Sequence, residues 1–202
     1  MPGDDATLAF YAETAERYAE RDVAGREQDT VGAFAGRLEA GATVLDFGCG
    51  GGWAAAALHG RGFDVHAIDG CAELAAIASR SLPRPVRVVS FEDFDDVEAH
   101  DGIFANGTLH HLTREALPGV LARIARALKP GGLLYASFKA GDGAERDSLG
   151  RLYTYVSEAQ LRDLIDGTPG LTCEELVSQD IVDFADVPCT ILGAFARKAA
   201  KS

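Results

Sequence analysis

The chain has 202 residues, of which 47% are apolar and 25% are charged, proportions typical of a globular protein with one sizeable core. It carries 31 acidic and 19 basic side chains, which gives a net charge of −12. A surface of that sign repels nucleic-acid backbones and anionic membranes, so we expect neither as a partner and a small molecule as the substrate.

The sequence shows no pattern for membrane insertion, secretion or metal binding. No apolar run is as long as a membrane span, and the acidic start MPGDDATLAF lacks a signal-peptide pattern. The four cysteines are scattered without a C-x-x-C pair, which argues against a zinc site and for a reducing compartment. We therefore expect a cytoplasmic monomer or homodimer that holds no metal ion.

Two helices are predicted before the first strand. The first covers residues 6–21, with Tyr11 and Tyr18 on its apolar face, and the second covers residues 31–38. Since both precede the alternation of strands and helices, we expect residues 1–40 to form a helical cap over a cleft.

Five short apolar runs then alternate with helical patterns. The predicted strands cover residues 43–46, 65–69, 86–89, 103–105 and 133–138. Such alternation is typical of a parallel sheet with helices on both faces.

The C-terminal part has a different pattern. Ser157 and Gln160 form a predicted capping box at the start of a helix. Two strand patterns follow at 171–177 and 190–196, and their connection is too short for a parallel crossover. We predict one α/β domain over residues 1–202: a doubly wound, Rossmann-like, mostly parallel seven-stranded sheet with an antiparallel C-terminal hairpin.

The segment DFGCGGG, residues 46–52, lies between the first strand and a helix. Glycines at alternate positions let the backbone turn sharply and approach a ligand with no Cβ in the way. A strand, a glycine loop and a helix N-terminus commonly hold an adenosine-containing cofactor. Asp46 adds a carboxylate, which suits a cofactor with a cationic group. The alternative is a tight structural turn.

Further candidate residues follow the second and third strands. Asp69, followed by Gly70, is placed to accept both hydroxyls of a ribose, although it also suits the N-cap of the next helix. Phe91 is a candidate to cover an adenine ring, and Glu92 or Asp93 to bond its edge. The alternative for this second group is a solvated acidic turn.

The fourth strand is followed by Asn106, Gly107 and the histidine pair His110 and His111. Asn106 is a candidate to bond the amino or carboxylate end of the cofactor. One histidine is a candidate to face the reacting centre as a base or as a wall, against a purely structural role.

Basic and aromatic residues lie beyond the fifth strand, in a segment with three glycines that is a candidate lid. Arg146 or Arg151 is a candidate to grip a substrate carboxylate, and surface charge is the alternative. The predicted substrate-binding residues are Trp53, Lys139, Arg146, Arg151 and Tyr153.

With these motifs together, the chain resembles the class I S-adenosylmethionine-dependent methyltransferases from about Thr43 to its C-terminus. VLDFGCGGG is similar to the glycine motif of that family, and HAID to the strand that ends in its ribose-binding acid. FANGTLHHL resembles the motif at the fourth strand, and LKPGGLLYASF the turn from helix to strand.

The resemblance implies S-adenosylmethionine as the cofactor and an N-terminal helix over it. It places Gly48 and Gly50 at the methionine part, Asp46 near the amino group and Asp69 at the ribose. The predicted cofactor-binding residues are Tyr11, Tyr18, Asp46, Phe47, Gly48, Cys49, Gly50, Asp69, Gly70, Phe91, Glu92, Asp93, Asn106 and Gly107.

The reaction that these residues predict is in-line transfer of a methyl group to an oxygen, nitrogen or sulfur atom of a small acceptor. A hydroxyl or thiol acceptor requires a base, for which His110 or His111 is the first candidate and a tyrosine the next; a neutral amine requires none. The alternatives are an NAD(P)-dependent oxidoreductase, because residues 50–55 fit G-x-G-x-x-A, and a non-catalytic module that binds S-adenosylmethionine.

Overall fold

The computed structural model describes residues 4–22 and 28–201. Residues 1–3 and 23–27 of the predicted N-terminal cap lie outside this described part. The helices are α1 (Asp5–Asp22), α2 (Gln28–Ala35), α3 (Trp53–Gly60), α4 (Ala72–Ala78), the short 3-10 helix η1 (Leu109–His111), α5 (Leu117–Ala127) and α6 (Glu158–Asp166). The strands are β1 (Thr43–Phe47), β2 (Asp64–Asp69), β3 (Arg87–Val88), β4 (His100–Ala105), β5 (Leu128–Lys139), β6 (Ala144–Arg146), β7 (Leu152–Thr154), β8 (Leu171–Val182) and β9 (Pro188–Lys198).

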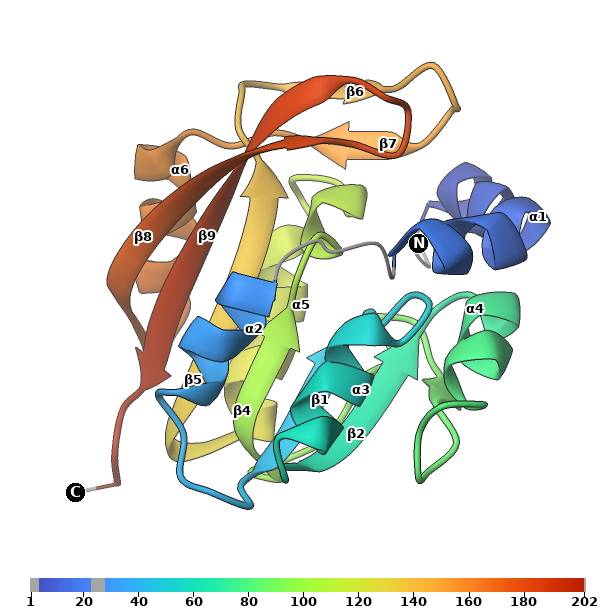
Figure 1. Ribbon diagram of the computed structural model, residues 1–202. Helices are drawn as coiled ribbons and strands as arrows, with labels where there is room; N and C mark the ends of the chain where they lie inside the picture. The colour runs from blue at the N-terminus through green and yellow to red at the C-terminus, as the bar shows by residue number, and fades with distance from the viewer. Residues whose placement is uncertain (1–3, 23–27, 202) are drawn as a thin grey trace.

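Seven strands form the central sheet in the order β3-β2-β1-β4-β5-β9-β8 (Figure 1). The first five run parallel, whereas β9 pairs antiparallel with both β5 and β8. The predicted fold class is therefore confirmed, including the C-terminal hairpin. The capping box is also present, since Gln160 N donates to Ser157 Oγ and Ser157 N donates to Gln160 Oε1.

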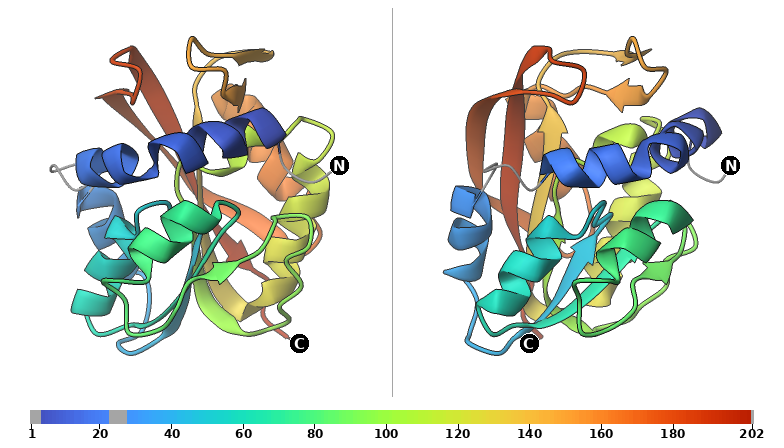
Figure 2. Two further views of the ribbon diagram at one scale, coloured as in Figure 1. Left: turned by 90° about the vertical axis from the view of Figure 1, so that its right-hand side faces the viewer. Right: turned by 45° about the vertical axis from the view of Figure 1, so that its right-hand side comes forward.

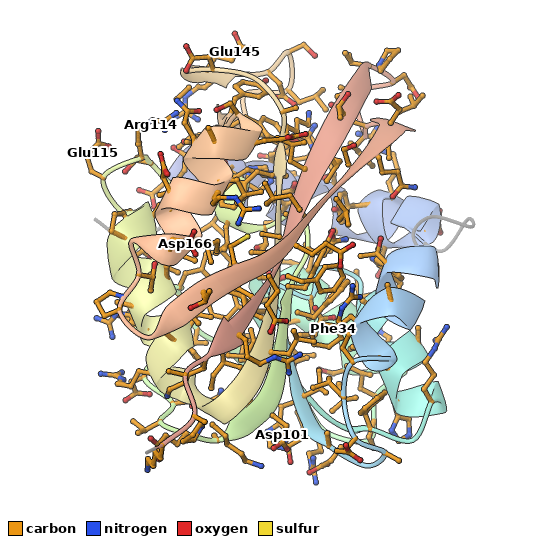
Figure 3. The ribbon with its side chains drawn as sticks, turned by 90° about the vertical axis from the view of Figure 1, so that its left-hand side faces the viewer. Phe34, Asp101, Arg114, Glu115, Glu145 and Asp166 are labelled. Atoms are coloured by element: carbon orange, nitrogen blue, oxygen red, sulfur yellow. The ribbon has the colours of Figure 1, made fainter. Side chains whose placement is uncertain are left out.

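Helices cover both faces of the sheet because successive strand residues point to opposite sides. On one face α2 and α3 pack on residues such as Val44 and Phe104, and Phe34 of α2 tilts against Phe104 at 5.2 Å between ring centroids. On the other face α5 and α6 pack on Leu45 and Phe47. Figure 3 shows Phe34 on one side of the β8–β9 hairpin and Asp166 of α6 on the other.

Some elements differ in length from the prediction. β3 has two exposed residues where four were predicted, because its edge position buries little of it. β8 and β9 extend well beyond residues 171–177 and 190–196, since the polar part of β8 pairs with β9 outside the core, where Thr190 Oγ1 donates to Asp180 at 2.7 Å. The candidate lid folds as the small antiparallel hairpin β6–β7.

Helix α1 crosses above the carboxyl ends of the parallel strands (Figure 2). It packs on α4 and directly on the glycine loop, where a Cβ on Gly51 would lie 2.8 Å from Ala19 Cβ. Helix α2 lies instead on the face of the sheet, so of the two helices expected in the cap only α1 lies over this edge.

The close approach of α1 predicts the effect of one added methyl group. We expect Gly51→Ala to lower the free energy of unfolding by about 1–3 kcal/mol, because the helix must move away from the loop. The control is Gly119→Ala in α5, where a Cβ meets nothing within 4 Å and where alanine favours the helix. Urea unfolding measures both; equal stability of the two variants would contradict the contact.

Candidate active site

A cavity lies at the carboxyl ends of β1, β2 and β4, under α1. We call it the first chamber. Its lining residues are Asp4, Thr7, Leu8, Tyr11, Tyr18, Gly48, Cys49, Gly50, Trp53, Asp69, Gly70, Leu74, Ser90, Phe91, Asn106, Gly107, Thr108, His111 and Leu112. Ten of the fourteen predicted cofactor-binding residues are in this set, and they come together from the loops after four strands and from α1.

The glycine loop folds into a cradle with its amide groups tied to the neighbouring strand. Gly48 N and Cys49 N both donate to Ile68 O at 2.9 Å. A Cβ on Gly48 would lie 2.0 Å from Thr108 Oγ1, and the residue has φ +76°, so only glycine fits there. Gly52 has a different role: a Cβ there would meet Ala78 of α4 at 2.7 Å.

The carboxylate of Asp69 links the glycine loop to the segment before α4, whose N-cap residue is Cys71. Its Oδ2 accepts from Gly50 N and its Oδ1 from Cys71 N at the start of α4, each at 2.8 Å. The side chain is buried, and burial raises the pKa of this carboxyl although the amides of Cys71 and Gly50 oppose the shift. Each oxygen has a second lone pair, and Asp69 lines the first chamber.

Four predicted cofactor-binding residues do not line this chamber. Asp46 lies on the α3 side of the sheet, where its Oδ2 accepts from Ala55 N at 3.0 Å. Phe47 lies in the core and stacks on Phe91. Asp93 accepts from Ser90 Oγ at 2.8 Å, and neither it nor Glu92 is among the lining residues.

The alternation of side chains along β1 was enough to predict on which face of the sheet Asp46 lies. Val44 and Asp46 are two residues apart and so share the face covered by α3. Seven lining residues of the first chamber were not among the predicted site residues: Asp4, Thr7, Leu8, Leu74, Ser90, Thr108 and Leu112. Leu8 precedes Tyr11 by three positions and shares its helical face, so the helical period was enough to identify it; the four polar residues had no comparable signal.

A second chamber adjoins the first, and the two share the lining residues Tyr11, Tyr18, Trp53, Asn106 and Gly107. The remaining residues of the second chamber are His110, Ser137, Lys139, Arg151, Tyr153, Ile181, Asp183, Phe184 and Ile191. Four of the five predicted substrate-binding residues line it. The contribution of the loop between β8 and β9 was not predicted, because strand periodicity does not indicate where the tip of a hairpin lies.

The two histidines lie in different environments. His111 Nδ1 donates to the carbonyl of Leu152 at 2.7 Å, so its neutral ring has Nε2 free to accept from Tyr11 OH at 2.9 Å. Burial lowers the pKa of His111 to about 4 and raises that of Tyr11 to about 12. His110 is buried, its Nδ1 has no hydrogen-bond partner in the part of the chain that the structure describes, and burial places its pKa well below the usual range.

The basic side chains expected to grip a substrate carboxylate have carboxylate partners within the protein. The Nη1 and Nη2 atoms of Arg146 donate to the carboxylate of Asp4 at 2.8 and 2.6 Å and so connect β6 to the start of α1. Arg146 lines neither chamber. Arg151 lines the second chamber, but its Nε and Nη2 bond Asp147 at 3.0 and 2.7 Å. Asp147 compensates the buried guanidinium of Arg151, which would otherwise be desolvated, whereas Arg146 is half-exposed and its ion pair holds the start of α1 against β6.

Two negative findings concern residues 4–22 and 28–201 alone. In this part of the chain no three His, Cys, Asp or Glu side chains lie close enough together to hold a metal ion. No helix there has the length and apolar character needed to cross a bilayer.

Comparisons with known proteins agree with this geometry. A family model described as a methyltransferase domain matches residues 45–136. The ubiquinone biosynthesis O-methyltransferase of Xanthomonas oryzae pv. oryzae is 35% identical over 105 residues. That match covers 48% of this chain and 43% of the relative, so it spans less than half the length of the curated protein.

Solved structures extend the similarity over nearly the whole chain. The 1,6-didemethyltoxoflavin-N1-methyltransferase of Burkholderia thailandensis, solved with 1,6-didemethyltoxoflavin and S-adenosylhomocysteine, is 27% identical with a TM-score of 0.78. The match covers 96% of this chain and 88% of that one. The cyclase SpnF, 18% identical with a TM-score of 0.71 over 98% and 94% of the two chains, shares the fold.

The neutral buried histidines predict how stability depends on pH. An unfolded histidine has a pKa near 6.5, whereas that of folded His111 is about 4, so the unfolded state binds the proton first. The stabilisation that the neutral, buried His111 gives the folded state is fully present above pH 6.5 and is lost as the pH falls toward 4. We expect the free energy of unfolding to fall by about 2–3 kcal/mol over this range, measured by urea unfolding at several pH values.

The matched variants are His111→Gln and, as control, His59→Gln at an exposed position of α3. In His111→Gln the free energy of unfolding should fall less steeply between pH 6.5 and 4. In His59→Gln it should fall as steeply as in the unsubstituted chain. An unchanged slope in His111→Gln would contradict a neutral, buried His111.

Proposed function

We propose that the chain acts as a class I S-adenosylmethionine-dependent methyltransferase and transfers the methyl group of S-adenosylmethionine to a small-molecule acceptor by in-line displacement, in agreement with the family model and the solved structure that it matches. The observation that carries this proposal is the pair of adjoining chambers. The first has a glycine cradle and a buried carboxylate, and the second shares Trp53 and Asn106 with it. A donor in one and an acceptor in the other face each other across this junction.

The residues of the first chamber fit the cofactor. Gly48 and Gly50 leave room for the methionine part against the backbone, and Asp69 offers one lone pair of each oxygen to the ribose hydroxyls. Phe91 presents a ring for adenine, and Asn106 lies at the junction with the second chamber. When bound, the cofactor supplies an electrophilic methyl carbon on a sulfonium. Asp46 has no part in this proposal, because its carboxylate bonds α3.

Tyr11 and His111 offer a route for a proton at the junction of the chambers. Tyr11 lines both chambers and donates to His111 Nε2. For a hydroxyl or thiol acceptor, the Tyr11 oxygen takes the acceptor proton while its own proton moves to Nε2, and the His111 ring stays fixed by Leu152 O. A neutral amine acceptor needs no such transfer before the displacement.

The charge and the cysteines support a cytoplasmic enzyme for small molecules. The net charge of −12 opposes nucleic-acid substrates. Cys49, Cys71, Cys173 and Cys189 form no disulfide among the described residues, as in proteins of a reducing compartment.

Two measurements test the proposed function directly. Protein extracted with methanol should release S-adenosylmethionine or S-adenosylhomocysteine, and no nicotinamide, in mass spectrometry. With methyl-labelled S-adenosylmethionine, label should pass to at least one member of a panel of small phenols, amines and thiols. Binding of the cofactor without transfer to any of them would favour the non-catalytic alternative, and a nicotinamide cofactor would overturn the proposal.

The ribose assignment predicts the effect of Asp69→Asn. We expect the affinity for S-adenosylhomocysteine to fall by about 1–3 kcal/mol, because charge-assisted hydrogen bonds are lost. Calorimetry measures this change, with Asp95→Ala, an exposed acid near β3, as the control that keeps full affinity. Equal affinity of the two variants would refute the assignment.

The proton route predicts a separate effect for Tyr11→Phe. The ring remains, so we expect S-adenosylhomocysteine to bind nearly as before, whereas kcat for a hydroxyl acceptor falls by about 100-fold. The rate with a neutral amine acceptor should change far less. A Tyr11→Phe variant that methylates a hydroxyl at the original rate would exclude Tyr11 from the route.

A further inference from the structure

The lining of the second chamber indicates the class of acceptor. This inference rests on the proposed function, because it assumes that the cofactor fills the first chamber. Three segments outside the parallel strands contribute to its walls: α1, the β6–β7 hairpin, and the loop between β8 and β9 that includes Phe184 (Figure 1). We propose that this chamber takes a flat, uncharged aromatic or heteroaromatic ring whose polar edge bonds His110.

The walls favour a flat acceptor because aromatic rings dominate them. Phe184 packs against Tyr18 at 5.2 Å between ring centroids, and Tyr153 against His110 at 4.8 Å. Trp53 stands at the junction with the first chamber, and the aliphatic lining residues are Ile181 and Ile191. Offset or edge-to-face contact with such rings rewards a planar ligand over a puckered one of equal size.

The charges of the chamber favour a neutral acceptor. Lys139 and Asp183 are both nearly fully buried and form an ion pair, and Lys139 Nζ also lies 3.8 Å from the centre of the Tyr153 ring. Arg151 is paired with Asp147. An anionic ring would lose its hydration and meet cations that are already neutralised, and a cationic ring would meet the sulfonium of the bound donor.

His110 provides a polar contact for the edge of the ring. It is 4% exposed, lines the chamber, and its Nδ1 is buried without a hydrogen-bond partner among the described residues. Because Nδ1 is enclosed by the protein, the polar edge of a ligand in the chamber meets the other ring nitrogen, Nε2. The depressed pKa of His110 agrees with a neutral ring that both donates and accepts.

Three ligands of similar size test the proposal on protein saturated with S-adenosylhomocysteine. They are 4-methylcatechol, which is flat and neutral, 3,4-dihydroxybenzoate, which is flat and anionic, and 4-methylcyclohexane-1,2-diol, which is neutral and puckered. Calorimetry should show 4-methylcatechol binding about tenfold more tightly than either of the others. A benzoate or a diol that binds as tightly as the catechol overturns the proposal, as does failure of all three to bind.

The loop between β8 and β9 offers a matched pair of variants. Phe184→Ala should lower the affinity for 4-methylcatechol by about 5- to 10-fold, because one aromatic ring of the wall is lost. Val187→Ala, an exposed residue of the same loop that lines neither chamber, should leave it unchanged. Equal affinity in the two variants counts against an acceptor seated on this wall.

The Lys139–Asp183 pair allows a reversal of preference. Asp183→Asn keeps an oxygen for the amides of Ala185 and Val187 but leaves Lys139 without its counter-charge. We expect this variant to bind 3,4-dihydroxybenzoate more tightly than 4-methylcatechol; an unchanged preference contradicts the charge argument. Thermal melting will show whether Asp183→Asn folds. If it does not, the ligand series on the unsubstituted chain and on the Phe184→Ala variant still tests the proposed class of acceptor.

A measurement of S-adenosylhomocysteine binding distinguishes failure of the acceptor class from failure of the proposed function. If the unsubstituted chain does not bind S-adenosylhomocysteine, the proposed function fails. If it binds S-adenosylhomocysteine but shows no preference for the flat neutral ligand, only the acceptor class is wrong.

Discussion

The candidate site depends on one buried carboxylate. Asp69 joins the glycine loop after β1 to the start of α4 through amide hydrogen bonds from Gly50 and Cys71. Without that link, the loop would be fixed mainly by Ile68 O, and its cradle under α1 would lose its shape. The same carboxylate is our candidate to hold the ribose, so the proposal gives one side chain a role both in ordering the loop and in binding the cofactor.

Much of the fold was predictable because local patterns determine it. Alternating strands and helices predicted the parallel sheet, and the short connection near the C-terminus predicted the antiparallel hairpin. The candidate site was predictable where its residues follow directly on strand ends, as Asp69 and Asn106 do. It was not predictable where partners are distant in sequence: Arg146 meets Asp4, and Tyr11 meets His111. Such pairs carry no local period.

The two chambers are built from different parts of the molecule. Loops that follow the parallel strands form most of the first chamber, and the sheet fixes their positions. The second chamber draws on α1, β7 and the hairpin tip at Phe184, which belong to no strand of the parallel part. A substitution at Phe184 or Ile181 therefore alters the wall of the second chamber and leaves the glycine cradle as it is. This separation lets the second chamber vary while the first keeps its shape.

The bidentate contact of Arg146 with Asp4 pins the beginning of α1 to β6, while Thr7 Oγ1 accepts from Leu152 N one turn later. These bonds hold the beginning of the helix over the first chamber. Dissolved salt weakens a half-exposed ion pair and has little effect on the aromatic contacts farther along the helix. The hold of α1 on its N-terminal side therefore loosens as ionic strength rises, while its aromatic side stays in place.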